Sequence, residues 1–282
     1  MKLVFALLLV TVATHANAQT PDSTAPKSTW ANKLVWSLNL SEAAYTDWTA
    51  GGDNTLAYVG IMNGSNIDNP TNFTWDNSYK LMFGQARLGD HGLRKTDDEI
   101  SLESILSLKL DSTMNPYASV SFKTQFAPGY TYTAGDSATR VSNFFDPAYF
   151  VESIGAIYQP NKIFKTRLGA GVREVLTTNF TRYSDNPETP QVEKTKIEGG
   201  FESVSELALP IDDALLLTSK LELFAPFHTL DKIIARSESG LTAKVNKFVT
   251  VNLNALFIND VTVTPRTQIK QSLSLGFIYS IL

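Results

Sequence analysis

The sequence has no cysteine and, outside its first residues, no long apolar run. Without cysteine there is no disulfide framework, so stability must come from side-chain packing or from closed backbone hydrogen bonding. Apart from the first residues, no stretch approaches the run of about 18 apolar residues that a membrane-spanning helix requires. The sequence therefore argues against both a disulfide-linked secreted domain and an α-helical membrane protein.

Histidine and positive charge are also scarce, with three histidines and a formal net charge of −4. This mild acidity argues against a nucleic-acid partner. Only His91 and His228 lie beyond the N-terminal segment, and both fall in or beside expected loops. Neither has the nearby nucleophile and acid of a hydrolase, and two histidines without cysteine form no recognisable metal site. We therefore expect no catalytic residues, no metal and no cofactor.

The N-terminus has the pattern of a secretory signal peptide. Lys2 precedes an apolar run from Leu3 to Ala13, and Ala16-Asn17-Ala18 supplies the small residues of a cleavage site. Cleavage after Ala18 would remove Lys2 and change the net charge from −4 to −5. We predict a signal peptide over residues 1–18, a flexible leader over 19–29 and one domain over 30–282.

The last sixteen residues show what the chain does contain, which is strand periodicity. From Ile269 to Ile281 apolar residues recur at almost every second position, and polar residues fill most places between them. The same rhythm predicts twelve strands, at residues 33–40, 55–67, 73–88, 98–110, 116–126, 148–158, 163–176, 194–209, 214–225, 232–245, 248–259 and 267–281. The fold class that fits is all-β, an antiparallel transmembrane β-barrel of about 12 strands behind a cleaved signal peptide.

The lengths of the expected connections alternate between long and short, as in outer-membrane barrels. The sorting predicts both termini in the periplasm, and long outer loops near residues 41–54, 127–147 and 177–193. The second and sixth strands have the weakest alternation, because Glu152 falls in register with Phe150 and Ile154. We expect a β-bulge in one of these two strands.

Charged residues alternate with apolar ones along several expected strands, which places the charges in the lumen. A row of bases on one strand should face a row of acids on the next. The predicted lumen charge network consists of Lys165, Arg167, Arg173, Glu198, Glu202, Glu206, Lys220, Glu222, Arg236 and Glu238, and Glu99 and Glu103 extend it. Such a network can form a constriction that selects small polar solutes, or it can fill a narrow interior with ion pairs and water.

A motif lies between the first two expected strands: Asn39-Leu40-Ser41, then an aromatic residue, then Asp47-Trp48-Thr49-Ala50-Gly51-Gly52-Asp53-Asn54. It resembles the opening motif of an uncharacterised family of Bacteroidetes-type outer-membrane proteins, the domain of unknown function 3078. The resemblance implies a barrel and an outer-membrane address but no activity. From the residues themselves we expect a structural turn at Trp48, Gly51, Gly52, Asp53 and Asn54.

These patterns favour a non-catalytic outer-membrane barrel, either a narrow channel for small polar solutes or a structural or interaction component of the envelope. The alternatives are an outer-membrane lipid-modifying enzyme, similar to acylases or phospholipases, and a soluble periplasmic barrel that binds an apolar ligand. Expected partners are outer-membrane lipid and the barrel assembly machinery, which would engage the C-terminal strand. The chain ends on Leu282, whereas closing strands of this class typically end on an aromatic residue.

Overall fold

The computed structural model describes residues 29–45, 53–133, 137–186 and 188–281. The barrel strands are β1 (Trp30–Ala43), β2 (Thr55–Asp68), β3 (Phe73–Leu88), β4 (Arg94–Leu108), β5 (Met114–Thr124), β8 (Ala148–Tyr158), β9 (Phe164–Leu176), β10 (Thr195–Pro210), β11 (Leu215–Pro226), β12 (Ile234–Lys244), β13 (Val249–Asn259) and β14 (Gln268–Ser280). They form a closed antiparallel barrel of twelve strands, in which β1 pairs with both β2 and β14. The predicted fold class is confirmed. The predicted signal peptide and the leader up to residue 28 lie outside the described residues.

The connections sort by length at the two ends of the barrel. At one end the strands are joined by residues 69–72, 109–113, 159–163, 211–214 and 245–248; we call this the short-turn end. At the other, the long-loop end, the longest connections span 44–54, 125–147 and 177–194. No helix in the described part of the chain is long and apolar enough to cross a membrane.

The short turns are closed by side-chain hydrogen bonds to the backbone. The carboxylate of Asp111 accepts a hydrogen bond from the backbone N–H of Thr113 at 2.8 Å, and this bond lowers the pKa of the Asp111 carboxyl. The amide oxygen of Asn161 accepts from the backbone N–H groups of Ile163 and Phe164 in the same way. Asp and Asn are favoured in turns for this reason.

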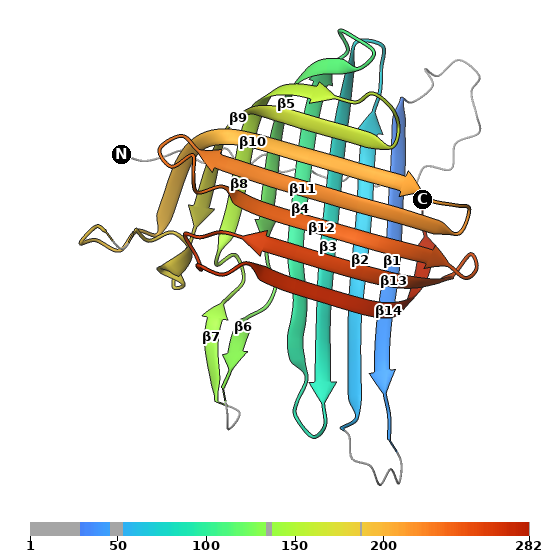
Figure 1. The fold of residues 1–282 in the computed structure, drawn as a ribbon, viewed down its shortest axis with the longest axis vertical. Coiled ribbons are helices and arrows are strands. Elements are labelled where there is room, and N and C mark those ends of the chain that lie inside the picture. Colours follow the sequence, from blue (N-terminus) through green and yellow to red (C-terminus); the bar gives the residue numbers. More distant parts are fainter. Residues whose placement is uncertain (1–28, 46–52, 134–136, 187, 282) are drawn as a thin grey trace, which may run out of the picture.

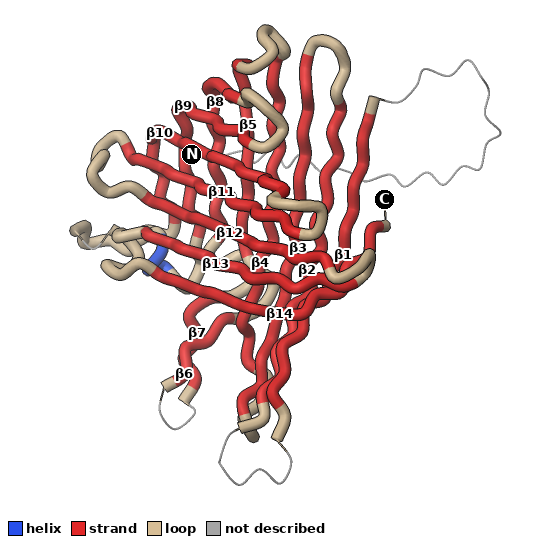
Figure 2. Tube along the Cα trace, turned by 45° about the vertical axis from the view of Figure 1, so that its right-hand side comes forward, coloured by secondary structure: helices blue, strands red, loops and turns tan. Residues whose placement is uncertain are grey.

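The barrel has two walls whose strands cross. Figure 1 shows β10 to β14 running across the front of β1 to β4 at a steep angle, and the turned view of Figure 2 shows the same crossing. Inward side chains from the two walls can therefore meet across the lumen. Part of this interior is packed with apolar side chains, since Ile105, Tyr117 and Ile157 form a buried cluster between β4, β5 and β8.

Two features differ from the sequence prediction. The long connection between β5 and β8 contains a hairpin, β6 (Gly129–Tyr132) and β7 (Ala138–Ser142), which forms its own two-stranded sheet and projects from the barrel in Figure 1. A short 3-10 helix, η1 (Thr181–Tyr183), lies in the connection after β9.

The expected bulge in the second or sixth strand was wrong. The pairing of β2 with β1 and β3, and of β8 with β5 and β9, is unbroken, and the register shift lies between Gly84 and Gln85, where β3 pairs with β4. Glu152 keeps the register of its strand and is exposed on the outer face of β8, opposite Val120 and Val172. The weak alternation of the sixth predicted strand thus reflects a charged residue on the outer face.

The outer face of the barrel is apolar. Ile154, Leu168 and Ile197 expose 67%, 62% and 62% of their surface to the exterior, and Leu253 and Leu273 are exposed in the same way on β13 and β14. Near the short-turn end, the rings of Trp30 and Trp75 lie 5.7 Å apart on this face. A continuous exposed apolar surface of this kind is typical of a barrel that lies in lipid.

Candidate functional site in the lumen

Strand alternation points the predicted charges into the lumen, where neighbouring strands pair them. Lys165, Arg167 and Arg173 lie on β9, and their side-chain nitrogens approach carboxylate oxygens of β10. The distances are 3.9 Å from Lys165 to Glu206, 3.6 Å from Arg167 to Glu202 and 3.2 Å from Arg173 to Glu198. The structure thus brings each base of this row to one acid of the next strand.

A second set of ion pairs joins strands that are not neighbours, and so crosses the lumen. Arg167 on β9 donates to Glu103 on β4 at 2.5 Å, and Lys220 on β11 approaches the other oxygen of Glu103 at 3.1 Å. Arg236 on β12 reaches Glu99 on β4 at 2.8 Å. Because these acids lie on the opposite wall, the pairs hold the two walls together at the level of β4.

Three lysines that the sequence analysis did not place in the network take part in it. Lys80 on β3 approaches Glu238 on β12 at 3.0 Å, and Lys123 on β5 pairs with Glu222 on β11. Lys270 on β14 pairs with Asp97 on β4. All three occupy inward positions of their strands, so the alternation of polar and apolar residues could have predicted that their side chains point into the lumen. It could not indicate which acid lies opposite.

The acids Glu198 and Glu238 belong to different parts of the lumen. Glu198 lies near the long-loop end, with Arg173, Lys196 at 3.0 Å and the exposed His228 at 3.6 Å around it. Arg173 also approaches Asp260 at 3.3 Å, at the end of β13. The ten predicted residues therefore form two clusters, a small one at the long-loop end and a larger one that crosses the middle of the barrel.

Arg167 is the most deeply buried base of the central cluster, with 2% of its surface exposed. Its Nη2 group donates to Glu103, whereas Nε and Nη1 have no hydrogen-bond partner among the described residues. Glu202 beside it accepts a hydrogen bond from the hydroxyl of Ser153 at 2.5 Å and another from Tyr117 at 3.5 Å. Burial this deep makes both charges dependent on each other.

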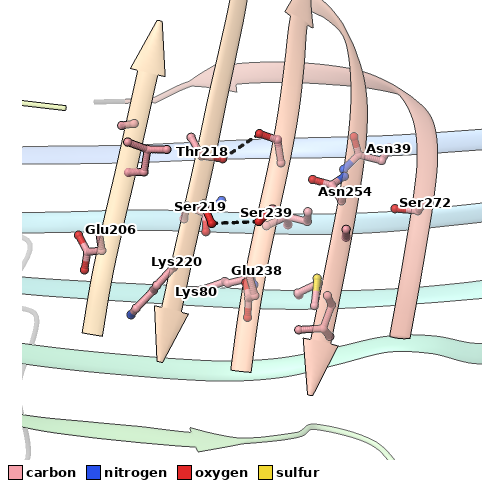
Figure 3. A pocket seen from close by; sticks show the side chains of 18 of the residues that line it. Asn39, Lys80, Glu206, Thr218, Ser219, Lys220, Glu238, Ser239, Asn254 and Ser272 are labelled. Carbon is pink, nitrogen blue, oxygen red and sulfur yellow. Dashed lines mark hydrogen bonds and ion pairs between the residues drawn. The ribbon is translucent and has the colours of Figure 1, made fainter. Parts of the chain in front are cut away.

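Beside the ion pairs the lumen contains a cavity of about 930 Å³, which we call the chamber. Its lining runs from the turn at Gln159 and Lys162 to Asn39 and Ser41 near the other end of β1. Figure 3 shows Asn39, Asn254 and Ser272 on one part of its wall, and Lys80, Glu206, Lys220 and Glu238 on another. The chamber thus extends along the barrel and borders the paired charges on one side.

The predicted family turn is described only in part, because Trp48, Gly51 and Gly52 lie outside the described residues. The side-chain oxygen of Asn54 accepts a hydrogen bond from the backbone N–H of Tyr45 at 2.6 Å, and its carbonyl accepts one from Gly89 at 2.7 Å. Asp53 lies against Gly89, which has a positive φ of 56°. Asn54 therefore links the first two strands to the connection after β3.

Several solved structures are similar to this chain at low sequence identity. The COG4313 outer membrane channel from Pseudomonas putida F1 is 13% identical, with 94% of this chain and 100% of that chain covered and a TM-score of 0.43. The NanC porin is 10% identical, with 89% and 100% covered and a TM-score of 0.42. The translocator domain of the autotransporter NalP from Neisseria meningitidis is 12% identical, with 91% and 90% covered and a TM-score of 0.37.

We find no match among curated protein sequences. A family model described as a protein of unknown function, DUF3078, matches residues 40–130, from the end of β1 to the start of β6. This segment includes the motif around Trp48 on which the resemblance rests. The chain is therefore similar, over residues 40–130, to the family of the domain of unknown function 3078, as its motif predicted.

Proposed function

We propose that this protein is a non-catalytic outer-membrane channel for small polar solutes. The observation that carries the proposal is the combination of an apolar outer face with a lumen that contains a chamber of about 930 Å³, lined by charged, polar and apolar side chains. A barrel whose interior only filled space would need no open volume of this size. The apolar face supports membrane lipid as the surrounding partner and disfavours the soluble periplasmic alternative.

The ion pairs across the lumen set the width of the path. Lys80, Lys123 and Lys220 each pair with an acid on a strand across the lumen. These ion pairs narrow the lumen beside the chamber. Buried or half-buried pairs are screened by salt less than surface pairs are. We therefore expect a narrow pore with small conductance steps.

A hydrolase function gains no support from the described contacts of His228. Its Nε2 lies 3.6 Å from a carboxylate oxygen of Glu198, whereas a serine or threonine hydrolase needs a hydroxyl beside the histidine.

The C-terminal strand β14, with Phe277 and Tyr279 exposed, is the segment we propose for recognition by the barrel assembly machinery.

The test is single-channel conductance of the refolded barrel in a planar bilayer, with the double variant Lys80→Ala/Glu238→Ala. This change removes one bridge between β3 and β12 without altering the net charge, and it shortens two lumen side chains. We expect small ohmic steps from the natural chain and larger steps from the variant.

The matched control is Asp231→Ala/Lys232→Ala, which removes one acid and one base from the exposed connection between β11 and β12. It should leave the conductance unchanged. Barrels that show the heat-dependent gel mobility of a folded barrel, but conduct in neither natural nor variant form, would disprove the channel.

A further inference from the structure

Most charged side chains around the chamber already have a partner of opposite charge. Lys80 lies within 3.3 Å of Glu99 and 3.0 Å of Glu238, and Lys220 within 3.1 Å of Glu103 and 3.2 Å of Glu222. Lys165, Arg236 and Lys270, which also line the chamber, each have an acid partner as well. Lys162, in the exposed turn at the edge of the chamber, has no acid partner among the described residues.

Some uncharged polar side chains of the chamber wall have no such partner. Asn39, Thr218, Ser219 and Ser239 do have hydrogen bonds. Asn63, Ser78, Asn254, Ser272 and Ser274 also line the chamber, and their side chains have no hydrogen-bond partner among the described residues. They come from both walls, since the first two lie on β2 and β3 and the others on β13 and β14. The chamber thus offers amide and hydroxyl groups, donors and acceptors together, that are available to a solute.

Apolar side chains lie between these polar groups. Val59 and Ile61 alternate with Asn63 along the inward face of β2, and Met82 follows Lys80 on β3. A solute with hydroxyl groups at its edges and C–H groups on its faces can satisfy both kinds of surface. The cavity volume lies within the range of about 300–1,000 Å³ that is usual for small-molecule sites.

These observations favour binding of neutral solutes over charged ones in the chamber. An ion that enters the chamber loses water and finds most of its potential partners already paired, so its desolvation is poorly compensated. A neutral hydroxylated solute exchanges its hydrogen bonds to water for hydrogen bonds to the wall at little cost. We propose that the chamber is a binding site for neutral, polyhydroxylated solutes of monosaccharide size, an inference that rests on the proposed channel function and specifies its solute.

Swelling of proteoliposomes tests the inference with three probes that share a six-carbon skeleton. Glucose is neutral, glucosamine is a cation and gluconate is an anion. We expect glucose to enter at least about tenfold faster than either charged probe, because only the charged probes carry the uncompensated desolvation. The unpaired Lys162 makes gluconate the more demanding comparison.

Two variants connect the preference to the chamber. Asn63→Leu and Asn254→Leu keep the approximate side-chain size and remove the amide, so each should slow glucose entry by about two- to tenfold, the equivalent of one lost hydrogen bond. Asn179→Leu, in the exposed connection after β9, is the matched control and should leave glucose entry unchanged. Heat-dependent gel mobility reports folding of every variant.

The outcomes separate this inference from the channel proposal. If the barrel conducts but admits gluconate or glucosamine as fast as glucose, the solute assignment is wrong while the channel stands. The same holds if folded Asn63→Leu and Asn254→Leu barrels admit glucose at the natural rate. A folded barrel that admits none of the three probes and shows no conductance overturns both.

Discussion

The effect of a charged lumen side chain on stability depends more on its ion-pair partners than on its burial. Arg167 lies between Glu103 and Glu202 and is 2% exposed. Its removal would leave Glu202 without a base beside it, whereas Glu103 would keep Lys220. Alternation along β9 predicted that Arg167 points inward. It could not predict the contact with Glu103, because that contact depends on which strands face each other after the barrel closes.

We predict that Arg167→Met destabilises the folded barrel by about 3–5 kcal/mol, the usual effect of breaking a buried ion pair from one side. Denaturant titration of folding into lipid vesicles measures this free energy. The double variant Arg167→Met/Glu202→Gln should recover part of the loss, since the acid that loses its only base is then neutral. A single variant as stable as the natural barrel would show that Arg167 does not hold the walls together.

Glu152 is the contrasting residue, a carboxylate on the apolar outer face between Val120 and Val172. A charge in this environment costs free energy, though less for an acid than the ~2–4 kcal/mol of a base at mid-bilayer. We predict that Glu152→Leu raises the free energy of unfolding in lipid vesicles by about 1 kcal/mol. Glu188→Leu, in the exposed connection after β9, should have no such effect. A loss of stability in Glu152→Leu would mean that the carboxylate is needed where it lies.

Individual strands followed the sequence prediction closely, because period two is a local property. The strands at residues 73–88 and 148–158 were predicted with the observed bounds, and the others differ by a few residues at one or both ends. The hairpin of β6 and β7 was missed because its strands are short and lie within a long connection. The register shift at Gly84 was also missed, since it depends on the pairing of β3 with β4 rather than on either strand alone.

Glycine permits an unusually close contact between β8 and β9. A Cβ atom at Gly155 would lie 2.1 Å from the carbonyl oxygen of Leu168, so a side chain there must push the two strands apart. We predict that Gly155→Ala lowers the denaturant midpoint of the folded barrel or prevents folding. Gly60→Ala is the matched control, because its Cβ would lie 3.9 Å from the nearest atom. Equal midpoints for both variants would contradict this account of the strand contact.

The whole barrel is defined by two crossing walls and by the seam between β1 and β14. The seam is short, with paired residues from Val35 to Leu40 on β1 and from Leu275 to Ser280 on β14. The sequence predicted that the last strand closes a barrel. The extent of the seam, and the meeting of β3 to β5 with β9, β11 and β12 across the lumen, follow only from the assembled shape.

The absence of cysteine allows a direct test of the seam. Leu38 and Phe277 are paired across it, so Leu38→Cys/Phe277→Cys should form a disulfide on oxidation and keep a faster gel mobility after heating until reductant is added. Leu38→Cys/Leu273→Cys is the control. Leu273 lies four residues further along β14, about 13 Å away at strand spacing, and should not be linked to Leu38. Linking in the control alone would show a different register at the seam.

The pairing of β1 with β14 also dictates an order of events during biogenesis. Most neighbouring strands in the barrel are consecutive in the chain and can pair as local hairpins, but Val35 can pair with Ser280 only after all the strands between them have been made. Until then the nascent sheet has two open edges that can pair with other chains. Shielding of β1 until β14 has been made would therefore limit pairing with other chains, an effect that a substitution acting only in the finished barrel cannot have.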